Sequence, residues 1–208
     1  MKHLQGTTYQ VAGESNTQRI VFFHGSGGGP DTPFMEFFTD QWQALGFEVV
    51  RPDFPYWQKV RESGVKRPPD RMERLVEQMR MWLSELQRDG KPLWLAGKSL
   101  GSRVMLRLAD EFEAQGQIAL GFPFNPPSKP ERSRLDELGY ARSPGLIIEG
   151  TRDPFAKQVR NRALILPSHW QIQWLEGGDH GFEPTAAKRH LRERLWLQAS
   201  RLTEEFLK

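Results

Sequence analysis

Three polar residues in the sequence have side chains that can together carry out nucleophilic catalysis. Ser99 is the centre of residues 97–101, which have the form Gly-x-Ser-x-Gly, and Asp153 and His180 follow later in the chain. A serine hydroxyl becomes a good nucleophile when a neighbouring base removes its proton, and histidine can do this near neutral pH. A carboxylate fixes the imidazole tautomer and stabilises the imidazolium that forms. These residue types predict acyl transfer with Ser99 as nucleophile, His180 as base and Asp153 as orienting acid.

Each of these residues also has a simpler interpretation. A serine between glycines is compatible with an ordinary turn, Asp153 before Pro154 is typical of a helix N-cap, and a lone loop histidine is often only solvated. Residues 97–99 also resemble the end of a phosphate-binding loop. That motif requires a glycine five residues before Gly97, where the chain has Pro92, so this interpretation is excluded. The three residues together are more specific than any one alone.

Each candidate residue follows a short apolar segment of the kind that forms a buried strand. These segments are residues 93–96, 146–149 and 172–175. The carboxyl ends of parallel strands meet at one edge of a sheet, and ligands bind there in open α/β folds. We therefore expect Ser99, Asp153 and His180 to meet at that edge, with Ser99 exposed on a tight turn from strand to helix.

Strands and helices alternate along the rest of the chain. Further strands are expected at residues 19–23, 47–52 and 118–122, and the alternating segment 172–175 is expected nearer an edge. Apolar residues at helical spacing predict helices over residues 34–45, 72–86, 104–112 and 191–206. This order predicts a three-layer α/β sandwich with a mostly parallel, doubly wound sheet of about six to seven strands. We expect residues 1–208 to form one such domain.

Negative charge that develops on a substrate oxygen requires hydrogen-bond donors. One expected donor is the backbone N–H of Leu100, directly after the nucleophile. The other is expected from the glycine-rich residues 24–29, with the N–H of Ser26 preferred and that of Gly27 as the alternative. Dinucleotide binding by this loop would require glycine at position 30, where the chain has Pro30.

Four aromatic residues lie after predicted strands, close to the proposed catalytic residues. They are Phe122, Phe124, Phe155 and Phe182. We expect them to line an apolar pocket for an acyl or alcohol group, with the alternative that most of them pack beneath the loops.

Residues 24–29, 97–103 and 121–131 resemble motifs of a known family. The chain resembles the alpha/beta-hydrolase superfamily in its dienelactone-hydrolase-like region. Within it, the chain resembles the small hydrolase-like domain family shared by a testis-expressed protein and a subunit of the non-specific lethal chromatin complex. The resemblance implies a serine hydrolase fold with Ser99, Asp153 and His180 at the triad positions.

Two departures from larger hydrolases are expected. Only about 18 residues precede the first predicted strand, so the usual leading antiparallel strands are expected to be mostly missing. Residues 123–144 are too few for a helical cap domain, so the site is expected to be shallow and open.

Composition narrows the class of protein further. The 208 residues include no cysteine, which excludes disulfides, cysteine-ligated metals and the cysteine nucleophile of dienelactone-type relatives. The net charge of +3, from 29 basic and 26 acidic residues, is too small to indicate nucleic acid. The N-terminus lacks a signal-peptide pattern, and no apolar run approaches the about 20 residues of a membrane helix.

The sequence therefore predicts a cytoplasmic, carboxylesterase-like serine hydrolase of small esters or thioesters. We expect no cofactor, no metal and no membrane partner, and a monomer or a homodimer. The alternative is a non-catalytic interaction module that has kept the hydrolase fold, because fold alone does not determine function.

Overall fold

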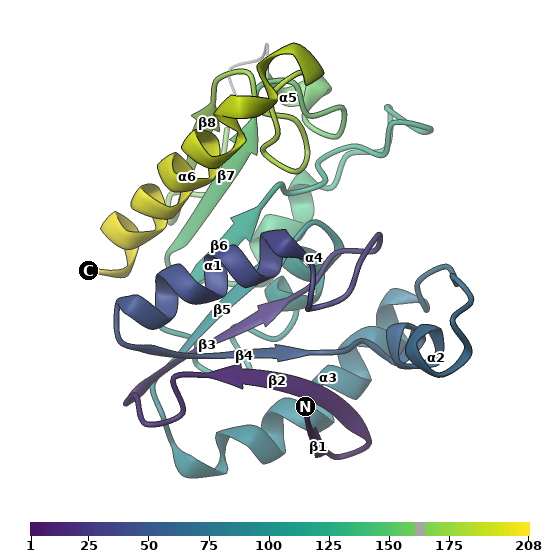
Figure 1. Ribbon diagram of the computed structural model, residues 1–208, viewed down its shortest axis with the longest axis vertical. Coiled ribbons are helices and arrows are strands. Elements are labelled where there is room, and N and C mark those ends of the chain that lie inside the picture. Colours follow the sequence, from purple (N-terminus) through teal and green to yellow (C-terminus); the bar gives the residue numbers. More distant parts are fainter. Residues whose placement is uncertain (161–164) are drawn as a thin grey trace.

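The strands of the computed structural model form one eight-stranded sheet (Figure 1). The structure describes residues 1–160 and 165–208. The strands are β1 (Lys2–Leu4), β2 (Thr7–Ala12), β3 (Gln18–Phe23), β4 (Phe47–Pro52), β5 (Leu93–Lys98), β6 (Gln117–Leu120), β7 (Gly145–Gly150) and β8 (Trp170–Leu175). Their order in the sheet is β1-β2-β4-β3-β5-β6-β7-β8, and the six strands from β4 to β8 in this order are parallel.

The predicted α/β sandwich with a mostly parallel sheet is confirmed, and all six predicted strands are present. The expectation that leading antiparallel strands are mostly missing is wrong. Strands β1 and β2 form a hairpin-like edge, antiparallel to each other and to β4. Their sequences lack a continuous apolar run, because they lie at the edge of the sheet with most side chains partly or fully exposed.

Helices cover both faces of the sheet. The α-helices are α1 (Pro33–Ala44), α2 (Pro55–Ser63), α3 (Met72–Leu86), α4 (Leu100–Leu106), α5 (Lys157–Arg160) and α6 (Arg192–Leu207). Short 3-10 helices are η1 (Gln87–Asp89), η2 (Leu135–Tyr140) and η3 (Ala186–Leu191). Helices α1 and α6 contact each other on one face (Figure 1), and α3 and α4 cover the other face.

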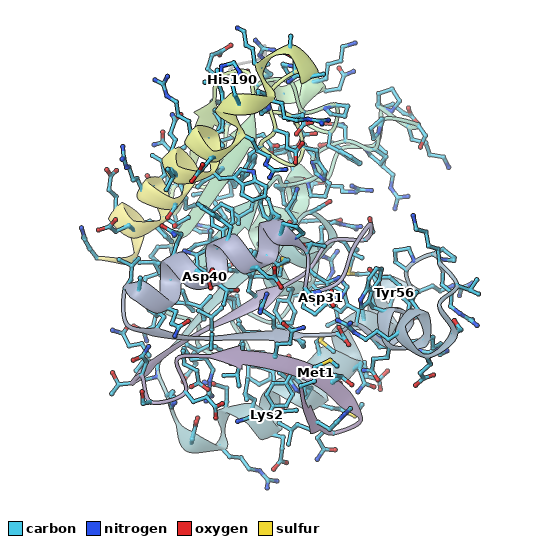
Figure 2. All side chains as sticks on the ribbon, in the orientation of Figure 1. Met1, Lys2, Asp31, Asp40, Tyr56 and His190 are labelled. Atoms are coloured by element: carbon cyan, nitrogen blue, oxygen red, sulfur yellow. The ribbon has the colours of Figure 1, made fainter. Side chains whose placement is uncertain are left out.

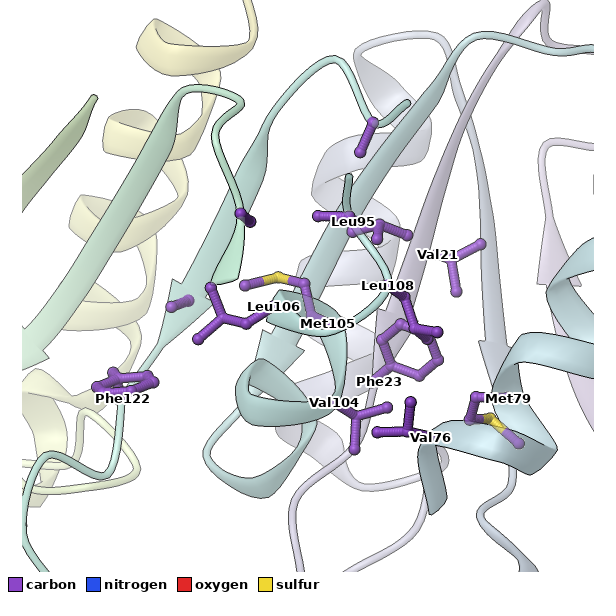
Figure 3. Close-up of a cluster of buried hydrophobic side chains, with 14 of the residues drawn as sticks. Val21, Phe23, Val76, Met79, Leu95, Val104, Met105, Leu106, Leu108 and Phe122 are labelled. Carbon is purple, nitrogen blue, oxygen red and sulfur yellow. The ribbon is translucent and has the colours of Figure 1, made fainter. Parts of the chain in front are cut away.

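The core has two halves because side chains of a strand alternate between the two faces of a sheet. In β3, Ile20 and Phe22 pack with α1 and α6, whereas Val21 and Phe23 pack with α3 and α4. Figure 3 shows the second half, where Val21 and Phe23 lie among apolar side chains of α3 and α4. Each large apolar side chain buried in this way stabilises the fold by about 2 kcal/mol. This packing holds the loops at the carboxyl ends of the strands in fixed positions.

The connection from β6 to β7 carries no cap domain. Within the described residues, this connection contains η2 and otherwise irregular backbone, as its short length predicted. The carboxyl ends of β5, β7 and β8 are therefore left without a helical lid from this segment. None of the helices in the described residues combines the length and the apolar character needed to cross a membrane.

Candidate active site

The turn from β5 into α4 places Ser99 in a backbone conformation that is rare for residues other than glycine. Its φ is 51° and its ψ is −109°. Glycine is needed on both sides because the turn packs against neighbouring backbone. A Cβ on Gly97 would lie 2.2 Å from the backbone nitrogen of Ser102, and one on Gly101 would lie 2.1 Å from the carbonyl oxygen of Phe23. This strain and close packing are features of a nucleophile elbow.

The structure brings the three predicted catalytic residues into one hydrogen-bonded chain. The Ser99 Oγ lies 2.9 Å from Nε2 of His180, and Nδ1 of His180 lies 2.5 Å from Oδ2 of Asp153. Ser99 follows β5, Asp153 follows β7 and His180 follows β8. Nδ1–H donates to the carboxylate, which leaves Nε2 free to accept the serine proton. This is the tautomer that general-base catalysis at Ser99 requires.

Asp153 is a buried carboxylate held from two sides. Its Oδ2 accepts from His180, and its Oδ1 accepts from the backbone N–H of Phe155 at 2.7 Å. Burial alone would raise the pKa of Asp153, but the hydrogen bonds and the proximity of His180 hold that pKa below its ordinary value. Asp153 is therefore ionised at neutral pH. Asp153 can both form the turn and contact the imidazole, because Oδ1 accepts from the backbone of Phe155 and Oδ2 accepts from His180.

His180 is held in its neutral form by its surroundings. Burial lowers the pKa of the imidazole, the positive charge of Lys98 lowers it further, and the Asp153 carboxylate opposes both effects. The Nζ of Lys98 donates to the backbone carbonyl of His180 at 2.5 Å. Burial also lowers the pKa of Lys98, to about 8. The ring of Phe155 packs against the imidazole with 4.5 Å between ring centroids.

A second histidine supports the glycine-rich loop after β3. Nδ1 of His24 donates to the carbonyl of Gly25 at 2.8 Å, and its Nε2 accepts from the backbone N–H of Phe54 at 3.1 Å. The hydroxyl of Tyr56, labelled in Figure 2, donates to the same Gly25 carbonyl at 3.1 Å. His24 is fully buried, and this burial lowers its pKa to about 4. The neutral imidazole thus fixes the loop that borders Ser99.

The depressed pKa of His24 predicts a pH-dependent stability. Unfolded His24 titrates near 6.5 and folded His24 near 4, so its contribution is present above pH 6.5 and is lost as pH falls through about 4. We expect the wild type to lose about 3 kcal/mol more than His24→Gln between neutral pH and about pH 4. Urea unfolding at several pH values measures this difference. The exposed His190, on η3, provides the control, since His190→Gln should follow the wild type. Equal pH dependence of wild type and His24→Gln would contradict the prediction.

The expected oxyanion donors border the nucleophile. A Cβ on Gly25 would lie 3.7 Å from the Cβ of Ser99, which shows how closely the loop after β3 approaches the serine. Ser26 and Gly27 line the same pocket as Ser99. Leu100 is the first residue of α4, where a backbone N–H has no carbonyl partner within its own helix. The loop after β3 and the first residue of α4 therefore both lie beside Ser99.

A pocket of about 430 Å³ opens beside Ser99 and His180. Of the four aromatic residues expected to line it, the structure places Phe155 there. The expectation is wrong for Phe122, Phe124 and Phe182. These three side chains are fully buried. Phe122, shown in Figure 3, and Phe124 lie in the half of the core that packs against α3 and α4. Phe182 lies in the half that packs against α1 and α6. These three aromatic side chains cover the faces of the sheet, so they pack beneath the loops and do not reach the pocket.

The apolar wall of the pocket comes instead from the two helices of one face. Phe34 and Met35 of α1 and Trp196 of α6 line it, with Glu183 and Arg192 also present. Sequence reasoning missed these residues because a helical aromatic looks like an ordinary core residue. The available signal was that α1 begins at Pro33, a few residues after the glycine-rich residues 24–29, so its first turn lies beside the site.

Glu149, Asp153 and His180 bring oxygen and nitrogen atoms within 4.8 Å of one another, a spacing that metal sites also show. Both imidazole nitrogens already have partners, since Nδ1 faces Asp153 and Nε2 faces Ser99. A metal ion would need one of these nitrogens. The cluster is therefore built for hydrogen bonding within the protein and does not fit a metal centre.

Solved structures with the same fold include several hydrolases. A dienelactone hydrolase from Anabaena variabilis has a TM-score of 0.70 at 18% identity, covering 94% of this chain and 89% of that chain. An alpha-beta serine hydrolase homologue from Coxiella burnetii has a TM-score of 0.62 at 18% identity, covering 92% and 91%. A serine hydrolase without a lid from Xanthomonas campestris has a TM-score of 0.58 at 18% identity, covering 92% and 88%.

At these identities the similarity concerns the fold. No curated protein sequence matches the chain. A family model described as an alpha/beta hydrolase domain matches residues 16–208, which is nearly the whole chain. The chain therefore belongs to the alpha/beta hydrolase domain family.

Proposed function

We propose that this protein is a serine hydrolase that cleaves small carboxylic esters or thioesters through an acyl-enzyme on Ser99. The observation that carries the proposal is the continuous hydrogen-bonded chain from Ser99 through His180 to Asp153, with distances of 2.9 and 2.5 Å. Ser99 and His180 of this hydrogen-bonded chain line the pocket. Ser99 lies on the strained turn between β5 and α4, a turn of the kind that exposes a serine nucleophile. Membership of a hydrolase family and the serine hydrolases among its structural neighbours support it further.

In the proposed reaction, Oγ of Ser99 attacks the substrate carbonyl carbon while Nε2 of His180 takes the hydroxyl proton. The negative charge moves to the carbonyl oxygen, where the backbone N–H groups of Ser26 and Leu100 stabilise it. The tetrahedral intermediate collapses, and His180 returns the proton to the leaving alcohol or thiol. A water molecule, deprotonated by His180, then attacks the acyl-enzyme and releases the acid and free Ser99.

The pocket supports a small substrate with an apolar group. Its wall is formed by Phe34, Met35, Phe155 and Trp196, and its volume is about 430 Å³. Apolar pockets with a few polar groups are typical of small-molecule sites. Within the described residues no lid covers this pocket from the β6–β7 connection, so we expect activity on short, soluble esters and no requirement for an interface.

A fluorophosphonate probe tests the proposal directly. We expect the probe to label the wild type and peptide mapping to locate the adduct on Ser99, because only a serine with an adjacent base reacts readily with phosphorus electrophiles. Ser99→Ala should not label. The control is Ser63→Ala at the exposed end of α2, which should label like the wild type. Absence of labelling in the wild type, or labelling at another residue, would contradict the proposal and favour a non-catalytic module.

Within the family, we also infer a kinship with the small hydrolase-like domains of a testis-expressed protein and of a subunit of the non-specific lethal chromatin complex. The motifs at residues 97–103 and 121–131 support this inference. The absence of cysteine from the sequence supports our further proposal that the protein works in the cytoplasm.

A further inference from the structure

A buried glutamate lies directly behind the proposed catalytic acid. Glu149 is in β7, four residues before Asp153, and its side chain has no exposed surface. Among the described residues, neither carboxyl oxygen of Glu149 receives a hydrogen bond. A buried ionised carboxylate without donors is strongly unfavourable, so the group must either find a donor or keep its proton.

Three charged or titratable side chains face Glu149, from three different elements. Lys98 comes from β5, Asp153 from the loop after β7 and His180 from the loop after β8. Within the part of the chain that the structure describes, Lys98 donates no hydrogen bond to Glu149, and its Nζ donates to the backbone carbonyl of His180. Lys98 is therefore not the donor that an ionised Glu149 would need.

Asp153 provides the acceptor that a protonated Glu149 requires. An oxygen of each carboxyl group lies within a cluster in which no two such atoms are more than 4.8 Å apart. Burial raises the pKa of Glu149 well above its ordinary value, the proximity of the Asp153 carboxylate raises it further, and the positive charge of Lys98 opposes this shift. One proton shared between the two carboxyl groups relieves both the buried charge and the repulsion.

We propose that Glu149 is a positioning residue that keeps its proton and donates it in a hydrogen bond to the Asp153 carboxylate. Asp153 then has three donors: the imidazole of His180, the backbone N–H of Phe155 and the carboxyl group of Glu149. The third donor restricts rotation of the Asp153 carboxylate and keeps Oδ2 directed at Nδ1 of His180. The effect on turnover rests on the proposed hydrolase function, whereas the protonation of Glu149 does not.

The protonation of Glu149 is tested without measuring activity. A carboxyl group whose folded pKa is raised contributes stability below its unfolded pKa and loses it as pH rises through the folded pKa. Above the unfolded pKa, Glu149 is ionised in the unfolded chain and protonated in the folded protein, so the wild type takes up one proton when it folds. The Glu149→Gln variant has no carboxyl group at this position and takes up no such proton. We expect the folding equilibrium constant of the wild type to fall about tenfold per pH unit relative to Glu149→Gln, over the range above about pH 4.3. Urea unfolding across this range measures it.

Glu176→Gln is the matched control, because Glu176 is an exposed glutamate directly after the neighbouring strand β8. This variant should show the same pH dependence of unfolding as the wild type. If Glu149→Gln also follows the wild type, Glu149 is ionised in the folded protein and the proposal is overturned, whatever the turnover.

Turnover tests the positioning role. Glu149→Gln keeps a donor of similar shape and should retain kcat, whereas Glu149→Leu removes the donor and should lower kcat about tenfold with KM unchanged. An unchanged kcat in a folded Glu149→Leu would overturn the positioning role. If the wild type hydrolyses no ester but the pH-linked unfolding differs as expected, the proposed function fails and the protonated Glu149 stands.

Discussion

His180→Ala is expected to reduce ester turnover by about 10⁴-fold or more, because the variant leaves Ser99 without a base. In the structure, His180 contacts both Ser99 and Asp153. In the proposed mechanism, its removal eliminates proton transfer in both acylation and deacylation. Turnover of p-nitrophenyl acetate under saturating and subsaturating conditions measures the loss, and most of it should appear in kcat.

The pH dependence of kcat/KM provides a second test of His180 as the base. In the proposed mechanism His180 acts as a base when it is neutral, and its pKa is lowered by burial and by Lys98. Wild-type kcat/KM should therefore fall at acid pH, with a midpoint below the ordinary pKa of histidine. This limb should be absent from the residual activity of His180→Ala. His190→Ala, on the exposed surface of η3 (Figure 2), should keep the full rate and the same limb. A His180→Ala variant with substantial turnover would assign the base elsewhere.

Asp153→Asn is expected to lower kcat by about 10⁴-fold while preserving the fold. An asparagine presents an N–H group to Nδ1 of His180, so the imidazole is driven toward the tautomer that carries its proton on Nε2. That tautomer cannot accept the proton of Ser99. Steady-state hydrolysis of the same ester measures the effect, and far-ultraviolet circular dichroism checks the fold.

The neighbouring Asp179 supplies the control for Asp153. Its Oδ1 accepts from the backbone N–H groups of Gly181 and Glu183, and an asparagine carbonyl can accept the same bonds. Asp179→Asn should therefore retain most of its turnover. If Asp153→Asn remains active and Asp179→Asn does not, the orienting acid is Asp179 and the assignment from the sequence is wrong.

The order of the predicted strands already indicated that Ser99, Asp153 and His180 would meet. Parallel strands deliver their following loops to one edge, so a residue after each of β5, β7 and β8 reaches the same place. The periodicity of apolar residues was equally informative for α3, which spans Met72–Leu86 as predicted. Both inferences depend on local patterns that each segment carries by itself.

The edge strands and the pocket wall could not be predicted in the same way. Strands β1 and β2 are stabilised by backbone pairing with β4, which leaves little trace in their own side chains. Whether an aromatic residue lines the pocket or the core depends on elements distant in sequence. Phe182 packs beside Phe34, whereas Phe34 itself reaches the pocket.

By itself, the sequence determined which residues form the candidate site and the alternation of strands and helices, because these follow from residue type and local spacing. With no cysteine, Ser99 was the credible nucleophile. The tertiary structure alone decided which groups surround that chemistry. In the sequence, Glu149 is simply one polar residue at the end of an apolar strand. Its burial without a donor beside Asp153 exists only after β5, β7 and the loop after β8 have packed together. Charge burial is a property of that assembled environment, and no single segment encodes it.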